Sequence, residues 1–469
     1  MLSTTEDAFA EPTGHENIGR ITFIAASAAM GGFLFGYDSS VINGAVTGIQ
    51  KHFAVGTAAT SLTVSAALLG SAVGAAIAGA LADRIGRKKV MYIAAVLFAI
   101  SAVGSALPFA IWDLAIWRVV GGIAIGIASM ISPAYIAEVA PAAYRGRLAS
   151  FQQAAIVLGI FVSQLVNYFI AQGAGGKSEG DLGPLQAWQW MLGVMVLPAV
   201  VYFVLAVGIP ESPRWLVKHG RDEQARHILE QLEGPGADAH LREIEHALST
   251  STKVRAKDLM GRFGFLPIVW IGIALSMLQQ FVGINVIFYY SSLLWQSVGI
   301  NQSDSLLISL STSFVNIIGT VIAMLLVDRV GRKPLAIAGS IGMAISLGII
   351  AWSFSYSTGT GTNVHIPDLQ GTMALVFAHV YTLCFAFSWG VVVWVLLGEM
   401  FPVRIRTGAM AIATAAQWIA NWIVTVTFPT MRDWNLSATY VIYACMAVLS
   451  LIFGAKFLKE TKGKTLESM

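Results

Sequence analysis

The sequence DRIGRKK at residues 83–89 recurs as DRVGRKP at residues 328–334, and each copy directly follows a long apolar run. A second pair of segments recurs in the same order, with EVAP at 138–141 and EMFP at 399–402. Two matches in the same order and at similar offsets make chance similarity a poor explanation. The chain therefore consists of two related halves, and each half carries one copy of both segments.

The composition is typical of a membrane protein. The chain has 469 residues, of which 56% are hydrophobic and 12% are charged, and its mean hydropathy is +0.69. Soluble domains carry about 25% charged residues, so we predict a protein that crosses a membrane many times. The net charge of +3 is too small to indicate a nucleic acid partner. Cys384 and Cys445 lie inside apolar runs, without the spacing of a disulfide framework or a metal site.

Twelve apolar runs are long enough to cross a bilayer, whose hydrocarbon core of about 30 Å needs roughly 20 helical residues. They lie near residues 21–45, 59–82, 89–108, 113–137, 148–171, 188–208, 265–296, 303–327, 335–354, 371–398, 408–429 and 436–457. Two parallel six-helix halves, related by an axis along the membrane normal, form the architecture of the major facilitator superfamily. We therefore predict an all-α membrane protein with two pseudo-symmetric six-helix bundles.

These runs divide the chain into five parts. They are an N-terminal tail (1–20), a six-helix bundle (21–208), a helical linker (209–264), a second six-helix bundle (265–457) and a C-terminal tail (458–469). The linker is polar and charged, and its pattern predicts short amphipathic helices, for example at 222–233 and 240–248.

The distribution of basic residues predicts the orientation in the membrane. Lys and Arg gather in the loops after the second, fourth, eighth and tenth spans, in the linker and in the C-terminal tail. The alternate loops are poor in them, with Lys51, Lys177 and Arg432 as the clear members. Residues 1–20 lack the basic start and the cleavage site of a signal peptide. We predict a multi-pass protein of the cell membrane with both termini and the linker in the cytoplasm.

Asp38 ends the segment GGFLFGYD (31–38) inside the first apolar run. An ionisable group in such a run costs roughly 2.5–3.5 kcal/mol on insertion scales, so it is a functional hypothesis by default. The alternative is an Asp at the end of a shorter helix, facing water outside the membrane. Arg118 opens the fourth span on the outer side and can share the depth of Asp38. An arginine favours the charged carboxylate and a drier site favours the protonated one, so we predict that this pair couples protons to transport.

The repeated loops carry acids as well as bases, and acids contribute little to membrane orientation. Gly86 and Gly331 permit tight turns, and carboxylate–guanidinium bonds can clamp neighbouring helices. We predict a cytoplasmic latch that holds the halves together in an outward-facing state. Its members are Asp83, Arg87, Glu138, Arg145, Glu211, Arg214, Asp328, Arg332, Glu399 and Arg406. The alternative, that the basic residues serve only orientation, is favoured for Lys88 and Lys89.

Five kinds of segment together resemble the sugar porter family within the major facilitator superfamily. They are GYD (36–38), both DRxGR loops, PESPRWL (210–216), QQFVGIN (279–285) and KETKGKTLE (459–467). These motifs run from the first span to the C-terminal tail, so the resemblance covers essentially the whole chain. The chain looks most like the bacterial proton-coupled sugar symporters, and the facilitative glucose carriers of animals are more distant. The resemblance implies a membrane carrier for a small sugar.

A neutral sugar needs amides that bind its hydroxyls and apolar or aromatic surfaces for its ring. Gln153, Ile156 and Ile160 share one face of the fifth span, and Gly283 lies among the amides of the seventh, where it could break the helix. The resemblance implies substrate binding by Gln153, Ile156, Ile160, Gln279, Gln280, Asn285, Asn316, Trp394 and Gln417, and a wall or gate of Phe35, Tyr289, Tyr290, Trp418 and Asn421. Hydrogen bonding between helices is the alternative role for such amides, and it stays open for Asn316.

The tenth span departs from the family pattern. It reads SWGVVVW at 388–394, whereas the family usually has Gly-Pro at the place of Gly390 and Val391. Losing the proline restores a backbone donor and removes an obligatory kink. This puts the gating role of the tenth helix in question, although Gly390 can still allow bending.

The sequence therefore predicts a proton-coupled sugar symporter that imports a hexose by alternating access. Symporters of the family carry Asp at the position of Asp38 and facilitative carriers a neutral amide, while Ile160 favours a hexose, with glucose as the first guess. An uncoupled uniporter and a non-transporting sugar sensor are the alternatives, although sensors normally need a longer cytoplasmic domain. No nucleophile elbow, phosphate loop or metal cluster indicates an enzyme. We expect a monomer in a lipid bilayer, with no cofactor beyond the proton as coupling ion.

Overall fold

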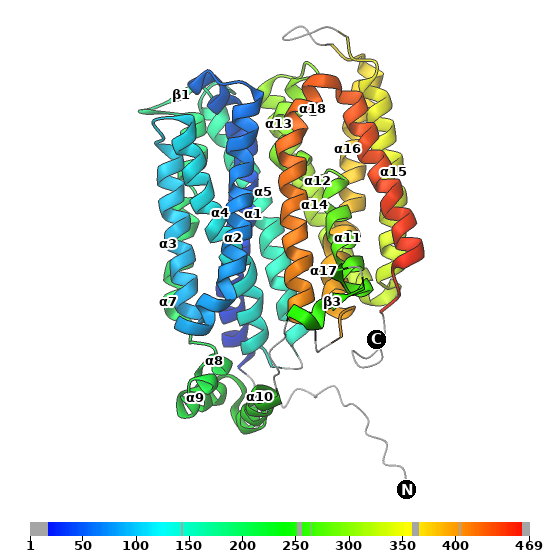
Figure 1. Cartoon of the computed structure of the whole chain (residues 1–469). Coiled ribbons are helices and arrows are strands. Elements are labelled where there is room, and N and C mark those ends of the chain that lie inside the picture. The colour runs from blue at the N-terminus through cyan, green and yellow to red at the C-terminus, as the bar shows by residue number, and fades with distance from the viewer. Residues whose placement is uncertain are drawn as a thin grey trace.

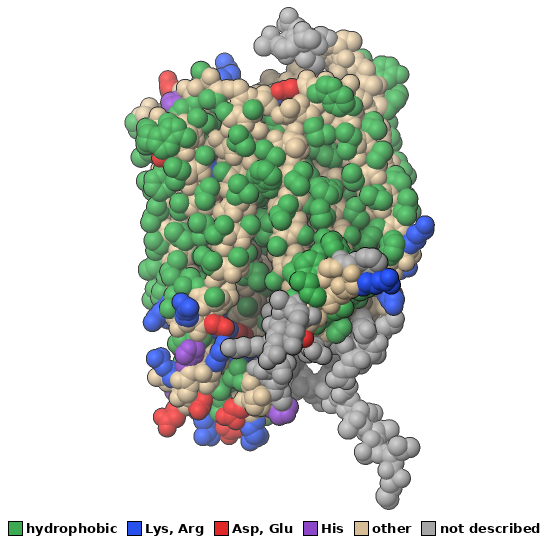
Figure 2. All heavy atoms as spheres, in the orientation of Figure 1, with side chains coloured by type: hydrophobic (Ala, Val, Ile, Leu, Met, Phe, Trp, Pro, Cys, Tyr) green, Lys and Arg blue, Asp and Glu red, His purple; other side chains and the backbone are tan. Residues whose placement is uncertain are grey.

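The computed structural model describes residues 17–141, 144–250, 256–262, 264–358, 365–402 and 405–461. Two bundles of long helices stand side by side, and the linker helices lie beyond one end of them (Figure 1). We call this end, which also carries the DRxGR loops, the linker end, and the opposite end the far end. Apolar side chains cover the sides of both bundles, and most of the charged side chains in view gather at the linker end (Figure 2).

The elements follow the predicted order. The first half contains α1 (Ile18–Phe53), α2 (Thr57–Ile85), α3 (Arg87–Ala106), α4 (Ile111–Val139), α5 (Arg145–Gly173), β1 (Asp181–Leu182), β2 (Leu185–Gln186), α6 (Ala187–Gly193) and α7 (Val196–Gly208). The linker contains α8 (Pro213–Lys218), α9 (Asp222–Glu233), α10 (Ala237–Thr250), β3 (Met260–Gly261) and β4 (Gly264–Phe265). The second half contains α11 (Pro267–Phe281), α12 (Ile284–Tyr289), α13 (Ser291–Gln296), α14 (Gln302–Val330), α15 (Arg332–Phe354), α16 (Asp368–Phe387), α17 (Trp389–Glu399) and α18 (Arg406–Phe457). The strands form two short antiparallel hairpins, β1–β2 and β3–β4.

Among the described residues, eleven helical segments are long and apolar enough to cross a membrane, and the last one spans Gly408–Phe457. Asn435 leaves helical geometry inside that segment (φ −165°, ψ 107°), so α18 is two helices joined at a kink. The prediction of an all-α membrane fold with twelve crossings is thereby confirmed. The bounds differ most in α1, which begins at Ile18 and continues to Phe53, whereas the predicted span was 21–45.

Two predicted spans of the second half are interrupted at mid-course, and in the first half the sixth span divides into α6 and α7. Gly283 separates α11 from α12 and has φ +86°, a backbone conformation that glycine adopts without strain. Ser388 (φ −123°, ψ −96°) separates α16 from α17. The tenth span therefore breaks without the proline that the family usually has, two residues before Gly390. Both breaks belong to the second half, and both adjoin the amides described below.

Close helix approach positions the candidate site. At Gly36 of α1 a Cβ would collide with the carbonyl oxygen of Ile156 in α5, and at Gly159 of α5 it would collide with that of Phe33 in α1. Small residues at such crossings allow helix backbones to approach in a membrane. The helix that carries Asp38 is thereby held against the helix that carries Gln153.

Candidate functional site

Asp38 and Arg118 form a buried ion pair between α1 and α4. Nη1 of Arg118 donates to Oδ1 of Asp38 at 2.6 Å, and Nη2 donates to the Asp38 carbonyl at 3.3 Å. The side chains are only 1% and 2% exposed. Within the described part of the chain, Oδ2 of Asp38 has no hydrogen-bond partner. The carboxylate can therefore accept a proton on Oδ2 without giving up the bond from Arg118.

Gly121 leaves the space beside that free oxygen. A Cβ at Gly121 would lie 3.0 Å from Oδ2 of Asp38 and 2.5 Å from Oγ of Ser101. The Ser101 hydroxyl donates instead to the carbonyl of Trp117 at 2.7 Å. Gly121 thus belongs to the site although the sequence analysis did not select it. The sequence feature that points to it is the glycine pair at 121–122, which lies one helical turn after Arg118.

Four amides of the second half form one network around Gln279. Nε2 of Gln279 donates to the Trp389 carbonyl at 2.9 Å, next to the break between α16 and α17. Its Oε1 accepts from Gln417 at 2.7 Å and from Gln280 at 3.3 Å, and Asn285 donates to Oε1 of Gln280. Oε1 of Gln417 is buried without a partner in the described residues. A hydroxylated ligand can supply the missing donor.

The other predicted substrate residues are not bonded to this network. Gln153, Ile156 and Ile160 lie half-buried on α5, and Asn316 is buried on α14. Trp394 is 40% exposed on α17, four residues from Gly398, where a Cβ would meet nothing within 4 Å. The structure thus brings the predicted amides of α11, α12 and α18 into direct contact and leaves Gln153, Asn316 and Trp394 outside it.

The predicted wall residues include contacts between the halves. The rings of Phe35 in α1 and Trp418 in α18 lie 5.9 Å apart, centre to centre. Tyr289 is buried and interacts with Asn421 of its own half and with Ser39, the residue after Asp38. A chain of contacts therefore leads from the ion pair to the second half through α12.

Tyr290, the last predicted wall residue, is fully buried. Its hydroxyl donates to the carbonyl of Thr425 at 3.1 Å, within the second half. This bond holds the junction between α12 and α13 against α18.

Hydrogen bonds also join the halves at the far end. The Thr57 hydroxyl of α2 donates to Oδ2 of Asp433 at 2.7 Å, and Nε2 of Gln172 donates to Oγ of Ser303 at 2.5 Å. Asn43 of α1 accepts from the backbone N–H of Ser292 in α13 at 2.8 Å. The molecule is closed at this end.

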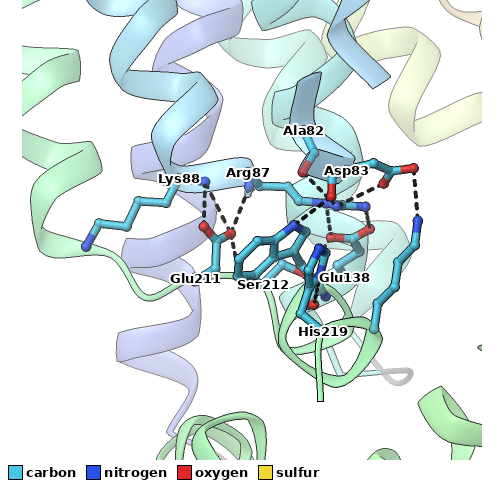
Figure 3. Close-up of polar contacts among 10 residues, drawn as sticks. Ala82, Asp83, Arg87, Lys88, Glu138, Glu211, Ser212 and His219 are labelled. Atoms are coloured by element: carbon cyan, nitrogen blue, oxygen red, sulfur yellow. Dashed lines mark hydrogen bonds and ion pairs between the residues drawn. The ribbon is translucent and has the colours of Figure 1, made fainter. Parts of the chain in front are cut away.

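A first charge cluster, made of Asp83, Arg87, Glu138, Glu211 and Ser212, lies at the linker end (Figure 3). The Arg87 guanidinium forms two bonds to Glu138, of 3.0 and 2.9 Å, and a third to Asp83 at 3.3 Å. Glu211 accepts from the backbone N–H of Arg87 at 2.9 Å, and Ser212 donates to Glu138 at 2.6 Å. The cluster ties the α2–α3 loop, α4 and the start of the linker together.

A second charge cluster repeats this arrangement with Asp328, Arg332, Glu399, Glu460 and Thr461. Arg332 bonds Glu399 at 3.0 and 2.7 Å, Glu460 accepts from the Arg332 N–H at 3.1 Å, and Thr461 donates to Glu399 at 2.6 Å. Glu460-Thr461 thus stands where Glu211-Ser212 stands in the first half. This third internal repeat escaped the sequence analysis because only an acid and a hydroxyl are shared.

The predicted latch does not join the halves in this structure. The pairs of Arg87 and Arg332 lie within their own halves, because the halves meet at the far end. Nε of Arg406 donates to the Phe401 carbonyl at 3.2 Å, in its own half. Arg214 is exposed and lines a cavity of about 360 Å³ beside Glu138. The Arg145 side chain lies outside the described residues, and a latch in the opposite state stays a prediction.

Comparison with known proteins places this geometry in context. The model of the sugar (and other) transporter family matches residues 24–469. The chain is 52% identical to the glucose transport protein of a Synechocystis strain, covering 97% of each chain. It is 40% identical to the D-xylose-proton symporter of Escherichia coli K12, over 97% of this chain and 96% of that one. The inward-open structure of the xylose transporter XylE from E. coli superposes with a TM-score of 0.81 at 39% identity, covering 96% and 98%.

Proposed function

Because the chain belongs to the sugar (and other) transporter family, we propose that it imports a hexose together with protons, and glucose is the first sugar to test. The buried Asp38–Arg118 pair carries this proposal, because Oδ2 of Asp38 is free to bind a proton. The names of the two relatives, a glucose transport protein and a D-xylose-proton symporter, support the sugar class and the coupling ion.

The linker end is the cytoplasmic end in this proposal, and both termini face the cytoplasm. The basic residues of the DRxGR loops and the linker support that assignment. The protein then lies in the cell membrane as a single chain, and the closed far end makes this state inward-facing. The likeness to an inward-open transporter supports the same reading.

In this proposal, the groups described above carry each step of alternating access. With the far end open, a proton from outside binds Oδ2 of Asp38, and the sugar hydroxyls bind the amides around Gln279. Closure of the far end brings Phe35 against Trp418 and turns both ligands toward the cytoplasm. Entry of one proton under 100 mV releases about 2.3 kcal/mol, which supports roughly fifty-fold accumulation at 1.36 kcal/mol per factor of ten. No cofactor beyond the proton takes part.

Purified protein in liposomes tests the proposal. Radiolabelled glucose, xylose and arabinose are offered with and without an imposed gradient that makes the interior alkaline. We expect glucose to accumulate above its outside concentration only with the gradient, and the outside medium to turn alkaline as it enters. Uptake that stops at equal concentrations would establish a uniporter instead, and binding without uptake would establish a sensor.

A further inference from the structure

The break between α16 and α17 is closed by bonds of Ser388 in place of a proline. The N–H of Ser388 donates to the Phe385 carbonyl at 3.2 Å, and its hydroxyl donates to the Cys384 carbonyl at 2.5 Å. The N–H of Val391, which the proline usual in the family would lack, donates to the Ser388 carbonyl at 3.1 Å. Each of these bonds is local, so other contacts must fix the break against the neighbouring helices.

Trp389, the residue after the break, is bonded to α15 through its indole. Nε1 donates to Oγ of Ser340 at 2.8 Å and to the Ala336 carbonyl at 3.1 Å. Oγ of Ser340 lies 2.9 Å from Oγ of Ser450 in α18, and the Ser450 hydroxyl donates to the Ala447 carbonyl at 2.7 Å. An indole N–H only donates and a carbonyl only accepts, so Ser340 accepts from Trp389 and donates to Ser450.

This chain of bonds joins α17, α15 and α18 inside the second half. Trp389, Ser340 and Ser450 are all 0% exposed, and every hydrogen in the chain has an acceptor. Buried polar networks that are fully satisfied make a core rigid. The residue after the break is therefore fixed to the body of the second half.

The backbone carbonyl of Trp389 orients the amide of Gln279. It accepts from Nε2 of Gln279 at 2.9 Å, and because a carbonyl cannot donate, the nitrogen end of the amide must face it. Oε1 of Gln279 is thereby turned toward Gln417 and Gln280, which both donate to it. Because Gln417 uses its Nε2 in this way, its Oε1, unpartnered in the described residues, is left to accept from a ligand hydroxyl.

We propose that Trp389 is a positioning residue for sugar binding. Its indole fixes the break to α15, and its carbonyl holds Gln279 in the orientation that leaves an acceptor for the sugar. Trp389 acts through Gln279, because its own side chain is fully buried. This role rests on the proposed function and adds a residue outside the predicted substrate and wall residues.

Equilibrium binding to the purified full chain in lipid nanodiscs tests this role. Radiolabelled glucose, xylose and arabinose are offered without a gradient. Phe in place of Trp389 keeps an aromatic ring but removes the N–H, so the Ser340 and Ala336 acceptors lose this donor in a buried place. We expect Trp389→Phe to weaken glucose binding about tenfold, which corresponds to ~1.4 kcal/mol. In liposomes, exchange of labelled glucose should show a raised KM and an unchanged rate at saturating sugar.

The matched control is Trp188→Phe. Trp188 is also 0% exposed and its Nε1 donates to Oε1 of Gln186 at 2.8 Å, but it lies on α6 in the first half. We expect both variants to lose thermal stability, because each removes a buried hydrogen bond. Only Trp389→Phe should change the affinity for the sugar.

A second pair of variants compares two buried serines of α15. Ser340→Ala removes one acceptor of the Trp389 indole and leaves the other, the Ala336 carbonyl. We expect it to weaken glucose binding by a smaller factor than Trp389→Phe. Ser346 is also buried, and its hydroxyl has no hydrogen-bond partner among the described residues. Ser346→Ala should therefore bind glucose as the parent does.

Unchanged affinity in Trp389→Phe, or an equal loss of affinity in Trp188→Phe, would overturn this role. A lower rate at saturating sugar with an unchanged KM would also overturn it. If Trp389→Phe fails to fold, Ser340→Ala decides, and unchanged binding in it counts against the role. A parent protein that binds none of the three sugars would remove the proposed function and this role together, so the two failures are distinguishable.

Discussion

Among the described residues, Asp38 uses one carboxylate oxygen for Arg118 and keeps the other free, which is the arrangement expected of a proton carrier. Asn at this position retains an oxygen that accepts from Arg118 but cannot bind a proton. We expect Asp38→Asn to lower glucose accumulation from roughly fifty-fold to equality while sparing exchange of labelled glucose across the membrane. Asp113→Asn is the control, because Asp113 is also largely buried on α4 but accepts from the backbone N–H of Phe109. Accumulation by Asp38→Asn would remove the coupling role.

The space beside Asp38 is a second property of single residues. A methyl group at Gly121 would press on Oδ2 of Asp38 and on the Ser101 hydroxyl, and overpacking of this kind costs about 1–3 kcal/mol. We expect Gly121→Ala to lower the thermal stability and to reduce gradient-driven uptake more than exchange. Gly79→Ala is the control, because a Cβ there meets nothing within 4 Å. Equal loss of uptake and exchange would show a general packing defect.

At the scale of helices, the hydrophobic pattern predicts the elements but not all of the junctions between them. Periodicity and length predict the spans, and the position of Gly283 among amides predicts the break in the seventh. The break at Ser388 was not foreseen, because it depends on how α16 packs in three dimensions and not on a proline. For the same reason, no local sequence pattern predicts the bond from Gln279 to the Trp389 carbonyl.

The break at Gly283 is itself testable. A side chain with φ near +86° costs roughly 1–2 kcal/mol, and a Cβ would also lie 2.9 Å from the Tyr443 ring. We expect Gly283→Ala to lower the melting temperature and to slow transport, because α12 and α13 would be seated incorrectly. Gly348 lies inside α15, where a Cβ would meet nothing within 4 Å, so Gly348→Ala is expected to be neutral or stabilising. Matching behaviour of the two variants would contradict a special role for the break.

Across the whole molecule, the repeat found in the sequence explains why there are two charge clusters. It does not explain whether their ion pairs form within a half or between the halves. Asp83, Arg87 and Glu138 were chosen from pattern alone, and the structure pairs them as it pairs their counterparts in the second half. Sequence could not show that the pairs lie within each half, because the same residues could pair within a half or across the seam.

The latch hypothesis applies to the opposite state, in which the linker ends of the two halves would meet. Glu138 and Glu399 already bind Arg87 and Arg332 here, so a latch requires that their remaining lone pairs accept from the other half when the linker end closes. We expect Glu138→Gln with Glu399→Gln to reduce the outward-facing population about tenfold, or ~1.4 kcal/mol, in distance measurements across the linker end. Glu230→Gln, on the exposed face of α9, is the control. An unchanged population in the double variant would show that the clusters stabilise each half separately. The equilibrium between the two states would then depend on the far-end contacts and on binding of the sugar and the proton.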